Sequence, residues 1–277
     1  MKVGLVIYGS IDSLSGGYLY DRTLVNFLRA RGDDVNVISL PDRSYPGRLA
    51  QNLISSFPKN LDLDLLLQDE LCHPSLISWN RKIKRSSRIP VISIVHHLLI
   101  SEPGHSAMMA ALYRRVEMAY LRSVDGFIFN SETTRQVVEV AIGRSDCAVV
   151  AHPGADRLGP EINGEEITAR AHAIGPLKIM FLGNVIPRKG LDVLLEALSR
   201  LSHLNWRLTV VGSLEMDRSY ANSAREAAEG GPNKGRIQFR GPLVDDRLAV
   251  EMREHHLMAL PSHYEGYGIA YLEAMGF

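Results

Sequence analysis

The stretch that decides the fold is PSHYEGYGIAYLEAMGF, residues 261–277. Its Pro-Ser pair follows an apolar run, and a short glycine-containing loop leads into Ile269 to Met275, a segment that favours a helix. Glu265 therefore lies in the loop, and Glu273 lies about one turn inside the helix. Both carboxylates can face the helix N-terminus, where free backbone N–H groups and a partial positive charge suit a phosphate or a diphosphate.

The loop glycines add to this expectation, because Gly266 and Gly268 let the backbone come close to a ligand. The order Pro-Ser, Glu-Gly, second Gly and Glu-Ala resembles the Glu-x7-Glu signature of retaining glycosyltransferases, family 4 in particular. The resemblance implies that Glu265 contacts sugar hydroxyls near the reacting carbon and that Glu273 accepts hydrogen bonds from ribose hydroxyls. It also implies that Tyr267, between the two glycines, belongs to the donor-binding loop.

Outside this stretch, apolar runs alternate with helix-forming segments. The run Val3 to Tyr8 is typical of a parallel strand that is buried on both faces. The alternation lapses at residues 154–176, an expected linker with a surface helix, and restarts with a strand at Lys178 to Leu182. This pattern predicts an α/β protein with two doubly wound parallel sheets, in residues 1–153 and 177–277. The resemblance implies a GT-B fold, in which an acceptor-side domain and a donor domain, both Rossmann-like, face a cleft.

The sequence FLGNVIPRKGLDVLLEAL opens the second domain at residues 181–198. It resembles the family's strand, glycine, arginine, variable loop, Lys-Gly and amphipathic helix, in which the arginine and the lysine clamp the donor diphosphate. Lys189 keeps the position of that lysine, whereas Asn184 stands at the position of the arginine. Arg188 either compensates for the arginine or lies on a solvated loop, and the sequence leaves both interpretations open. Gly212 ends the next strand in a turn that, by the same resemblance, lies beneath the nucleotide base.

Two places in the first domain carry candidate ligand contacts. Gly16 and Gly17 follow the first strand and can turn backbone N–H groups towards a ligand, although they form no GxGxxG motif. His96 follows the strand Val91 to Val95, at the edge of the sheet where ligands of α/β proteins bind. The resemblance implies that His96 contacts the donor sugar. Ser131 matches a helix start of the family, and a helix N-cap is the favoured interpretation.

Composition sets the broad class of protein. Hydrophobic residues make up 45% of the 277 residues and charged residues 22%, which are globular values. The formal net charge of zero gives no electrostatic argument for a nucleic-acid partner. Cys72 and Cys147 lack metal-ligand spacing, so reduced thiols are expected. The apolar start is a strand rather than a signal peptide, and no run reaches membrane-spanning length, so the expected location is the cytoplasm.

These features predict a glycosyltransferase. The resemblance implies transfer of a hexose from a nucleotide-diphosphate sugar to a hydroxyl of a glycan, a lipid or a small molecule, with retention at the reacting carbon. Glu265, His96 and Lys189 are the expected catalytic residues. The lysine would neutralise the departing diphosphate, so the resemblance implies neither a metal ion nor a cofactor.

Two other interpretations concern the whole chain. Family members continue beyond the position of Phe277, so the second domain is expected to be incomplete and the chain truncated. The alternative to a transferase is then a non-catalytic nucleotide-sugar-binding fragment, or a subunit that a second chain completes. A Rossmann oxidoreductase does not fit, because the dinucleotide fingerprint is missing.

A basic run lies in a predicted helix of the first domain. Its members are Arg81, Lys82, Lys84, Arg85 and Arg88. Such a run can contact anionic lipid headgroups, as in relatives whose acceptors are lipids, and would place the protein peripherally at the inner face of the membrane. A solvated helix face is the alternative, and the sequence leaves the choice open.

Overall fold

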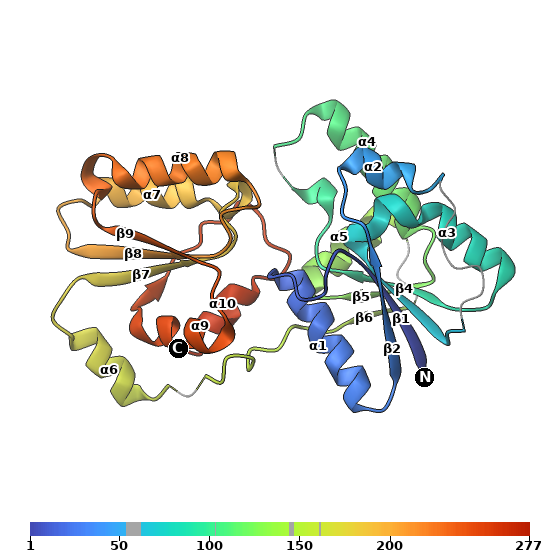
Figure 1. Cartoon of the computed structure of the whole chain (residues 1–277), viewed down its shortest axis with the longest axis horizontal. Helices are drawn as coiled ribbons and strands as arrows, with labels where there is room; N and C mark the ends of the chain where they lie inside the picture. The colour runs from blue at the N-terminus through green and yellow to red at the C-terminus, as the bar shows by residue number, and fades with distance from the viewer. Residues whose placement is uncertain (54–61, 103, 144–146, 161) are drawn as a thin grey trace. The chain divides into compact units, whose positions relative to one another are not determined.

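The fold is α/β with two parallel sheets, as the sequence predicts (Figure 1). We describe it from a computed structural model. The residues described are 1–53, 62–102, 104–143, 147–160 and 162–277. The chain divides into two units, Met1–Pro153 and Gly154–Phe277. Within the described residues, no helix is both long enough and apolar enough to cross a bilayer.

The first unit is built on a six-stranded parallel sheet with the strand order β2-β1-β3-β4-β5-β6. Its strands are β1 (Lys2–Tyr8), β2 (Asp34–Leu40), β3 (Leu65–Asp69), β4 (Val91–Val95), β5 (Gly126–Phe129) and β6 (Ala148–Val150). Its helices are α1 (Gly16–Ala30), α2 (Tyr45–Ala50), α3 (His73–Ser86), α4 (Ala107–Leu121) and α5 (Glu132–Ile142), with 3₁₀ turns η1 (Glu70–Cys72) and η2 (Leu99–Ser101). The chain reverses its winding direction between β1 and β3, which makes the carboxyl ends of these strands the expected ligand position.

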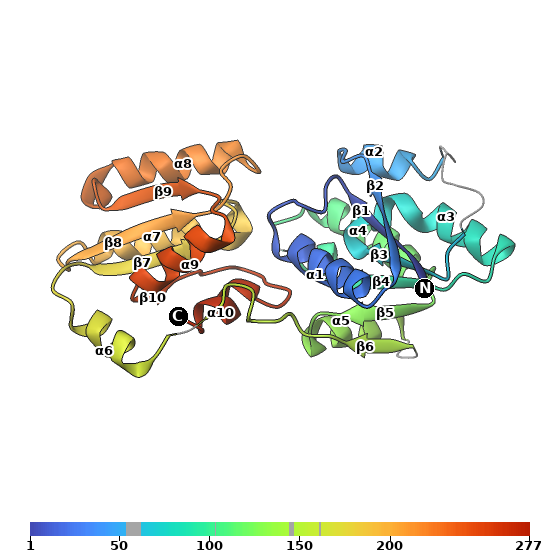
Figure 2. The ribbon, with the colours of Figure 1, turned by 60° about the horizontal axis from the view of Figure 1, so that its bottom comes forward.

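Helices cover both faces of this sheet, and this explains why β1 is apolar along its length (Figure 2). Leu5 and Ile7 pack with Val25 of α1 on one face. Val6 belongs to the core on the other face, together with Leu76 of α3. An alternating pattern in β1 would bury polar side chains in one of these two cores, so apolar side chains are needed on both faces of the strand.

The second unit is built on a four-stranded parallel sheet with the order β10-β7-β8-β9. Its strands are β7 (Leu177–Leu182), β8 (Trp206–Val211), β9 (Ile237–Gly241) and β10 (Leu257–Met258). Its helices are α6 (Gly164–His172), α7 (Leu191–Arg200), α8 (Arg218–Glu229), α9 (Asp245–Glu254) and α10 (Ile269–Ala274), with 3₁₀ turns η3 (Pro187–Lys189) and η4 (Gly231–Asn233). Here the winding reverses between β7 and β10, so the loops that follow these two strands meet at the switch point.

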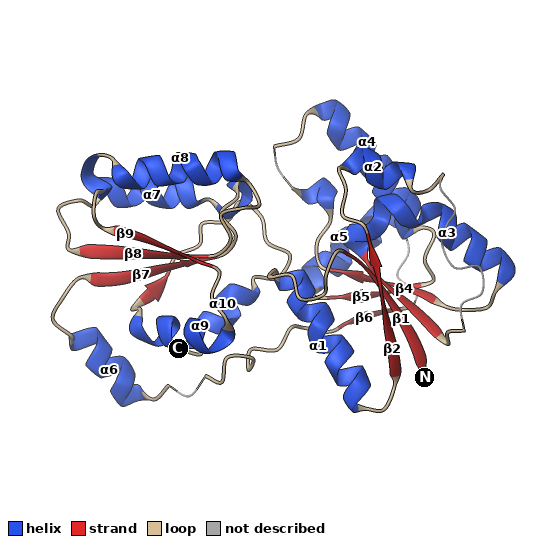
Figure 3. Ribbon diagram, in the orientation of Figure 1, coloured by secondary structure: helices blue, strands red, loops and turns tan. Residues whose placement is uncertain are grey.

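The core of the second unit also has two sides, with α7 and α8 on one face of the sheet and α9 on the other (Figure 3). Phe181 and Leu195 belong to the first side. Met180 and Leu248 belong to the second side. The segment 154–176, expected as a linker, contains α6, whose N-cap is the Asn163 side chain; Glu161 of this segment lies outside the described residues.

Candidate functional site

The loops after β7, β8 and β10 pack backbone against backbone in the second unit. Gly190 has φ +68°, and a Cβ atom there would lie 2.1 Å from the carbonyl oxygen of Pro261. Gly212 has φ +145°, and a Cβ atom there would lie 2.0 Å from the carbonyl oxygen of Gly183. Because only glycine fits both the backbone angle and the space, these two residues allow the three loops to close on one another.

This packing brings Lys189 and Glu265 together. The Lys189 Nζ lies 2.5 Å from Oε1 of Glu265, and the Ser262 hydroxyl donates to the same oxygen at 2.7 Å. The two charged side chains are only 16% and 22% exposed. Burial lowers the pKa of the Lys189 ammonium, and the neighbouring Glu265 carboxylate opposes that shift. The sequence predicted Lys189 and Glu265 as site residues. It did not indicate Ser262, since a serine after a proline occurs in many places that bind no ligand.

The side chains of Arg188 and Lys189 both contact the loop that follows β10. Its Nη1 donates to the carbonyl oxygen of Tyr264 at 2.8 Å and lies 3.7 Å from Oε2 of Glu265. The carbonyl oxygen of Arg188 in turn accepts from the backbone N–H of His263 at 2.9 Å. Adjacent side chains usually diverge, yet here the β10 loop crosses η3 closely enough to contact both. Two cations therefore lie beside one carboxylate.

Asn184 does not supply a charge at the position where the resemblance expects an arginine. Its Oδ1 accepts from the backbone N–H of Ser213 at 3.3 Å, and the N–H of Val185 donates to the carbonyl oxygen of Ser213 at 2.9 Å. Asn184 therefore ties the loop after β7 to the turn after β8, which contains Gly212.

Glu273 has a protein partner that the sequence did not reveal. This carboxylate is 3% exposed, and the Nε of Arg157 donates to its Oε1 at 2.7 Å. Arg157 also forms an ion pair with Asp245 at the start of α9. Arg157 lies in the segment expected as a linker, so no motif pointed to it.

The α10 helix is shorter than a typical anion-binding helix. It comprises six residues, and Gly268 precedes it with φ +89°. Gly266 and Tyr267 lie in the same loop, between Glu265 and this cap. A helix dipole grows with the number of aligned peptide units, so the cations of η3 are the main positive charges beside this loop.

In the first unit, His96 lies against the start of α1. A Cβ atom on Gly17 would lie 3.0 Å from Cδ2 of the His96 ring, so glycine makes room for the imidazole. The Nε2 of His96 lies 3.0 Å from Oδ1 of Asp21, and the Asn130 amide donates to the His96 carbonyl oxygen at 2.7 Å. Gly16 is the first residue of α1. The structure thus brings the glycine pair and His96 to one edge of the sheet.

The same edge of the first unit holds a buried group of acids that the sequence did not single out. Burial, together with the charge of Asp21, raises the pKa of Asp69 to about 7. Burial raises the pKa of Glu70 to about 8, and the pKa of Glu117 rises to about 8 for the same reason. Burial lowers the pKa of His73 to about 4. At neutral pH these carboxyls are therefore at least partly protonated, and His73 is neutral.

Two sets of these side chains have metal-ligand chemistry and spacing: Asp21, Asp69 and His96, and Glu70, His73 and Glu117. Several of their donor atoms already have protein partners, although Oδ2 of Asp21 and Oε1 of Glu70 have no hydrogen bond among the described residues. Asp69 accepts from the N–H of Leu71 at 3.0 Å, and Glu117 accepts from the N–H groups of two residues of η2. We therefore interpret both sets as hydrogen-bonded networks and assign no metal ligand.

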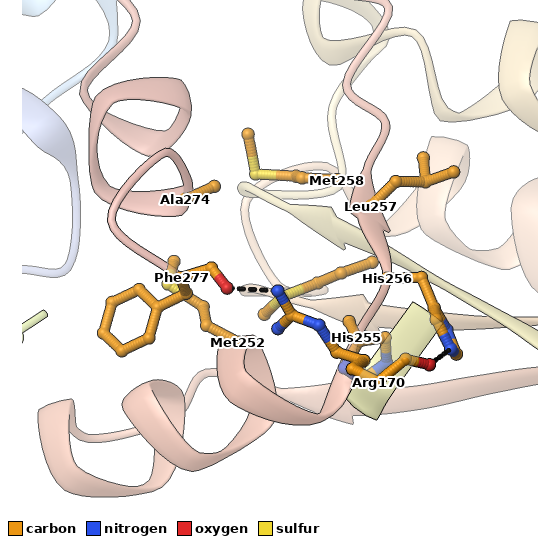
Figure 4. Close-up of a pocket in the computed structure, with 9 residues that line it drawn as sticks. Arg170, Met252, His255, His256, Leu257, Met258, Ala274 and Phe277 are labelled. Carbon is orange, nitrogen blue, oxygen red and sulfur yellow. Dashed lines mark hydrogen bonds between the residues drawn. The ribbon is translucent and has the colours of Figure 1, made fainter. Parts of the chain in front are cut away.

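A small pocket in the second unit is lined by residues that the sequence did not single out (Figure 4). Its lining residues include Met252, His256 and Phe277. Arg170 of α6 crosses it and donates to the carbonyl oxygen of Phe277. None of the side chains nominated from the sequence lines this pocket.

The basic run predicted for a helix lies on α3 and just beyond it. Its five side chains are exposed, while Leu76, Trp79 and Ile83 on the opposite side of α3 are buried. Lys84 is partly neutralised, because its Nζ lies 2.9 Å from Oδ1 of Asp125.

Comparison with solved structures defines the class of fold. Sucrose-phosphate synthase from Thermosynechococcus elongatus superposes with a TM-score of 0.77 at 18% identity, over 99% of this chain and 78% of that one. Anabaena HepE in complex with UDP and glucose gives a TM-score of 0.69 at 18% identity, over 100% of this chain and 78% of that one. The fold is that of GT-B glycosyltransferases.

Comparison of sequences finds similar proteins among the glycosyltransferases. Residues 165–277 match the family of group 1 glycosyl transferases. D-inositol 3-phosphate glycosyltransferase of Nocardia farcinica is 31% identical over 68% of this chain and 44% of its own length. Phosphatidyl-myo-inositol mannosyltransferase of Mycobacterium leprae is 24% identical over 99% of this chain and 76% of its own length. The chain spans less than half of the D-inositol 3-phosphate glycosyltransferases that it resembles.

Proposed function

We propose that this protein is a retaining glycosyltransferase that moves a hexose from a nucleotide-diphosphate sugar to a hydroxyl acceptor. The observation that carries the proposal is the contact between Lys189 and Glu265 at the switch point of the second sheet. This is the position where ligands of open α/β sheets bind, and the paired groups suit the two ends of a sugar diphosphate. The family match of residues 165–277 supports the same activity.

In this proposal, Lys189 and Arg188 neutralise the diphosphate as it departs. Both cations are fixed to the loop after β10 before any ligand binds, so little reorganisation is needed when charge develops. Glu265 contacts the sugar hydroxyls, and its bond to Ser262 orients the carboxylate. No metal ion or cofactor is proposed, because the lysine and the arginine supply the positive charge.

The remaining nominated residues complete the proposal. Glu273 is proposed to contact the ribose, with its orientation set by Arg157. The loop residues Gly266, Tyr267 and Gly268, and the turn at Gly212, line the donor. Gly16, Gly17 and His96 of the first unit contact the substrate through backbone N–H groups and the imidazole.

A second candidate function is nucleotide-sugar binding without turnover. Asn184 favours it, because this side chain binds Ser213 and brings no charge to the position of the expected arginine. A donor site with fewer cations stabilises the departing diphosphate less, while the donor itself can still bind.

Donor binding and sugar transfer are measured separately to distinguish these functions. The purified full chain is heated with UDP-glucose, GDP-mannose or ADP-glucose, and a ligand that binds the folded state raises the melting temperature. We expect one nucleotide to give a shift that Lys189→Ala abolishes. Lys234→Ala, which removes an exposed lysine of the same unit, is the matched control and keeps the shift.

Transfer is then assayed with that donor and either inositol 3-phosphate or phosphatidylinositol vesicles, acceptors suggested by the names of the relatives. Glu265→Gln is expected to lower turnover by about 100-fold or more while the protein stays folded. Glu226→Gln, an exposed glutamate of α8, is the control. Donor binding without transfer would favour the binding function, and no shift with any donor would contradict both.

A further inference from the structure

His96 is held on several sides by residues of the first unit. Gly17 lies beneath its ring, and the Tyr20 ring meets it edge-on with centroids 5.2 Å apart. Asn130 binds its carbonyl oxygen, and Asp21 binds its Nε2. These contacts hold the His96 side chain in one orientation. The hydrogen-bond partner of each ring nitrogen then determines which nitrogen carries a proton.

Asp21 is the unusual member of this set. Its side chain is fully buried, and Oδ2 has no hydrogen-bond partner among the described residues. Oδ1 lies 3.0 Å from Nε2 of His96. A buried carboxylate is costly unless it is paired, so His96 is the group that compensates it.

The two ring nitrogens of His96 therefore differ. Nε2 is occupied by Asp21, whereas no hydrogen bond to Nδ1 is found within the part of the chain that the structure describes. The imidazole is 12% exposed, which leaves a small part of it open to solvent.

We propose that Asp21 is a positioning residue, which holds His96 with its Nε2–H donated to the buried carboxylate and so presents Nδ1–H to an oxygen of the substrate. This inference rests on the proposed function, in which His96 contacts the substrate. The substrate group that Nδ1–H contacts must be an acceptor, such as a hydroxyl or phosphate oxygen. A group that only donates, such as an ammonium or an amide N–H, does not fit.

The charges around His96 support this protonation state. Burial by itself lowers the pKa of the imidazole, but the charge of Asp21 of α1 and its hydrogen bond to the ring outweigh burial. Asp69 of β3 and Glu70 of η1 contribute less, as they ionise, and together these groups raise the pKa to about 9. Tyr20, the titratable aromatic neighbour, has a pKa raised to about 12 by burial and by Asp21, so it stays neutral. Both nitrogens of His96 then carry protons at neutral pH, and Nδ1 can only donate.

The first test is NMR of the full chain labelled with ¹⁵N and ¹³C in histidine, in which the signals of His96 are assigned with His96→Gln. We expect both ring nitrogens to stay protonated up to about pH 9 in the native protein. In Asp21→Asn the titration is expected to move at least about two pH units lower, because the compensating charge is gone. Asp12→Asn, an exposed aspartate of the same unit, should leave it unchanged.

Several outcomes would overturn the proposal. One is a neutral His96 at pH 7 in the native protein, and another is an unchanged titration in Asp21→Asn. If Asp21→Asn does not fold, the nitrogen shifts of the native protein still decide, since they report whether Nε2 is the hydrogen-bonded N–H. These readouts need no turnover, so they stand even where the transferase proposal fails.

The second test couples Asp21 to His96 through activity, measured with the donor and acceptor identified above. Asp21→Asn is expected to lower kcat more than it changes KM for the donor. The alkaline limb of the pH profile should move from about pH 9 to below pH 7. In a His96→Gln background the same substitution should have little further effect, because the positioned group is absent. Additive losses in the double variant would show a purely structural role for Asp21.

Discussion

At the scale of single residues, the second unit depends on glycines that permit contact between loops. Gly190 is the clearest case, because its φ is +68° and Pro261 occupies the place of a Cβ atom. The neighbouring Lys189 is held by Glu265 of the same loop as Pro261, so displacement of this loop would also displace the ion pair. The geometry of the proposed donor site therefore depends on a residue that has no side chain.

Gly190→Ala is expected to destabilise the second unit by about 2–3 kcal/mol, through a strained backbone and a forced shift of the β10 loop. Gly235→Ala is a matched control, because Gly235 has φ +75° but open space around the Cβ position. Its expected cost is only the backbone strain, about 1 kcal/mol. Urea unfolding measures both values. Equal losses for the two variants would contradict the loop-contact argument.

At the scale of secondary-structure elements, α3 is strongly two-sided. Its buried side carries Trp79 and Ile83, and its exposed side carries Arg81, Lys82 and Arg85. Lys84 differs from these, because Asp125 offsets its charge. A helix with a fixed apolar side cannot insert that side into lipid without unfolding the core, so any membrane contact must be electrostatic and sensitive to salt.

Vesicle sedimentation tests this expectation for α3. The full chain should co-sediment with vesicles that contain phosphatidylserine at low salt, and binding should fall several-fold in a double variant with Lys82→Glu and Arg85→Glu. A double variant with Arg207→Glu and Lys234→Glu changes the net charge equally on the second unit and is the control. Retained binding in the α3 variant would favour the solvated-face interpretation.

At the scale of the whole molecule, the interior of the first unit contains carboxyl groups that stay protonated to unusually high pH. Glu70, Glu117 and Asp69 are buried, and their pKa values are raised to about 8, 8 and 7, respectively. His73 beside them stays neutral, since burial lowers its pKa to about 4. At mildly acidic pH the folded unit keeps its carboxyl protons, whereas the unfolded chain releases them.

The first unit should therefore lose stability as the pH rises from 6.0 to 8.5. A carboxyl whose pKa is higher in the folded state stabilises that state at low pH, and the benefit disappears as the pH passes through the folded-state value. We expect a loss of several kcal/mol, seen as a fall in the melting temperature of the first unit. In Trp206→Phe the fluorescence reports Trp79 of the first unit alone.

A Glu70→Gln variant provides the control for this pH effect. It removes one of the titrating carboxyls, so its melting temperature should depend less on pH. A melting temperature of the first unit that rises between pH 6.0 and 8.5 would show that these carboxyls are ionised in the folded protein.

Much of this architecture was predictable because it depends on local patterns. Apolar runs such as Val3 to Tyr8 predicted strands buried on both faces, and the alternation predicted parallel sheets. The expected N-cap of α5 is confirmed, since the Ser131 hydroxyl accepts from the N–H of Thr134. The sequence also nominated Lys189 and Glu265, because each lies in a loop with a recognisable neighbourhood.

What the sequence alone determined about this protein is therefore the type and order of its elements, together with the loops that carry charged residues. The tertiary structure decided which charges meet. Lys189 pairs with Glu265 across 76 residues, His96 with Asp21 across 75, and Glu273 with Arg157 across 116. Helix and strand periodicity reports only which face of an element is buried, whereas these pairs depend on which strand ends lie side by side once the sheets have formed.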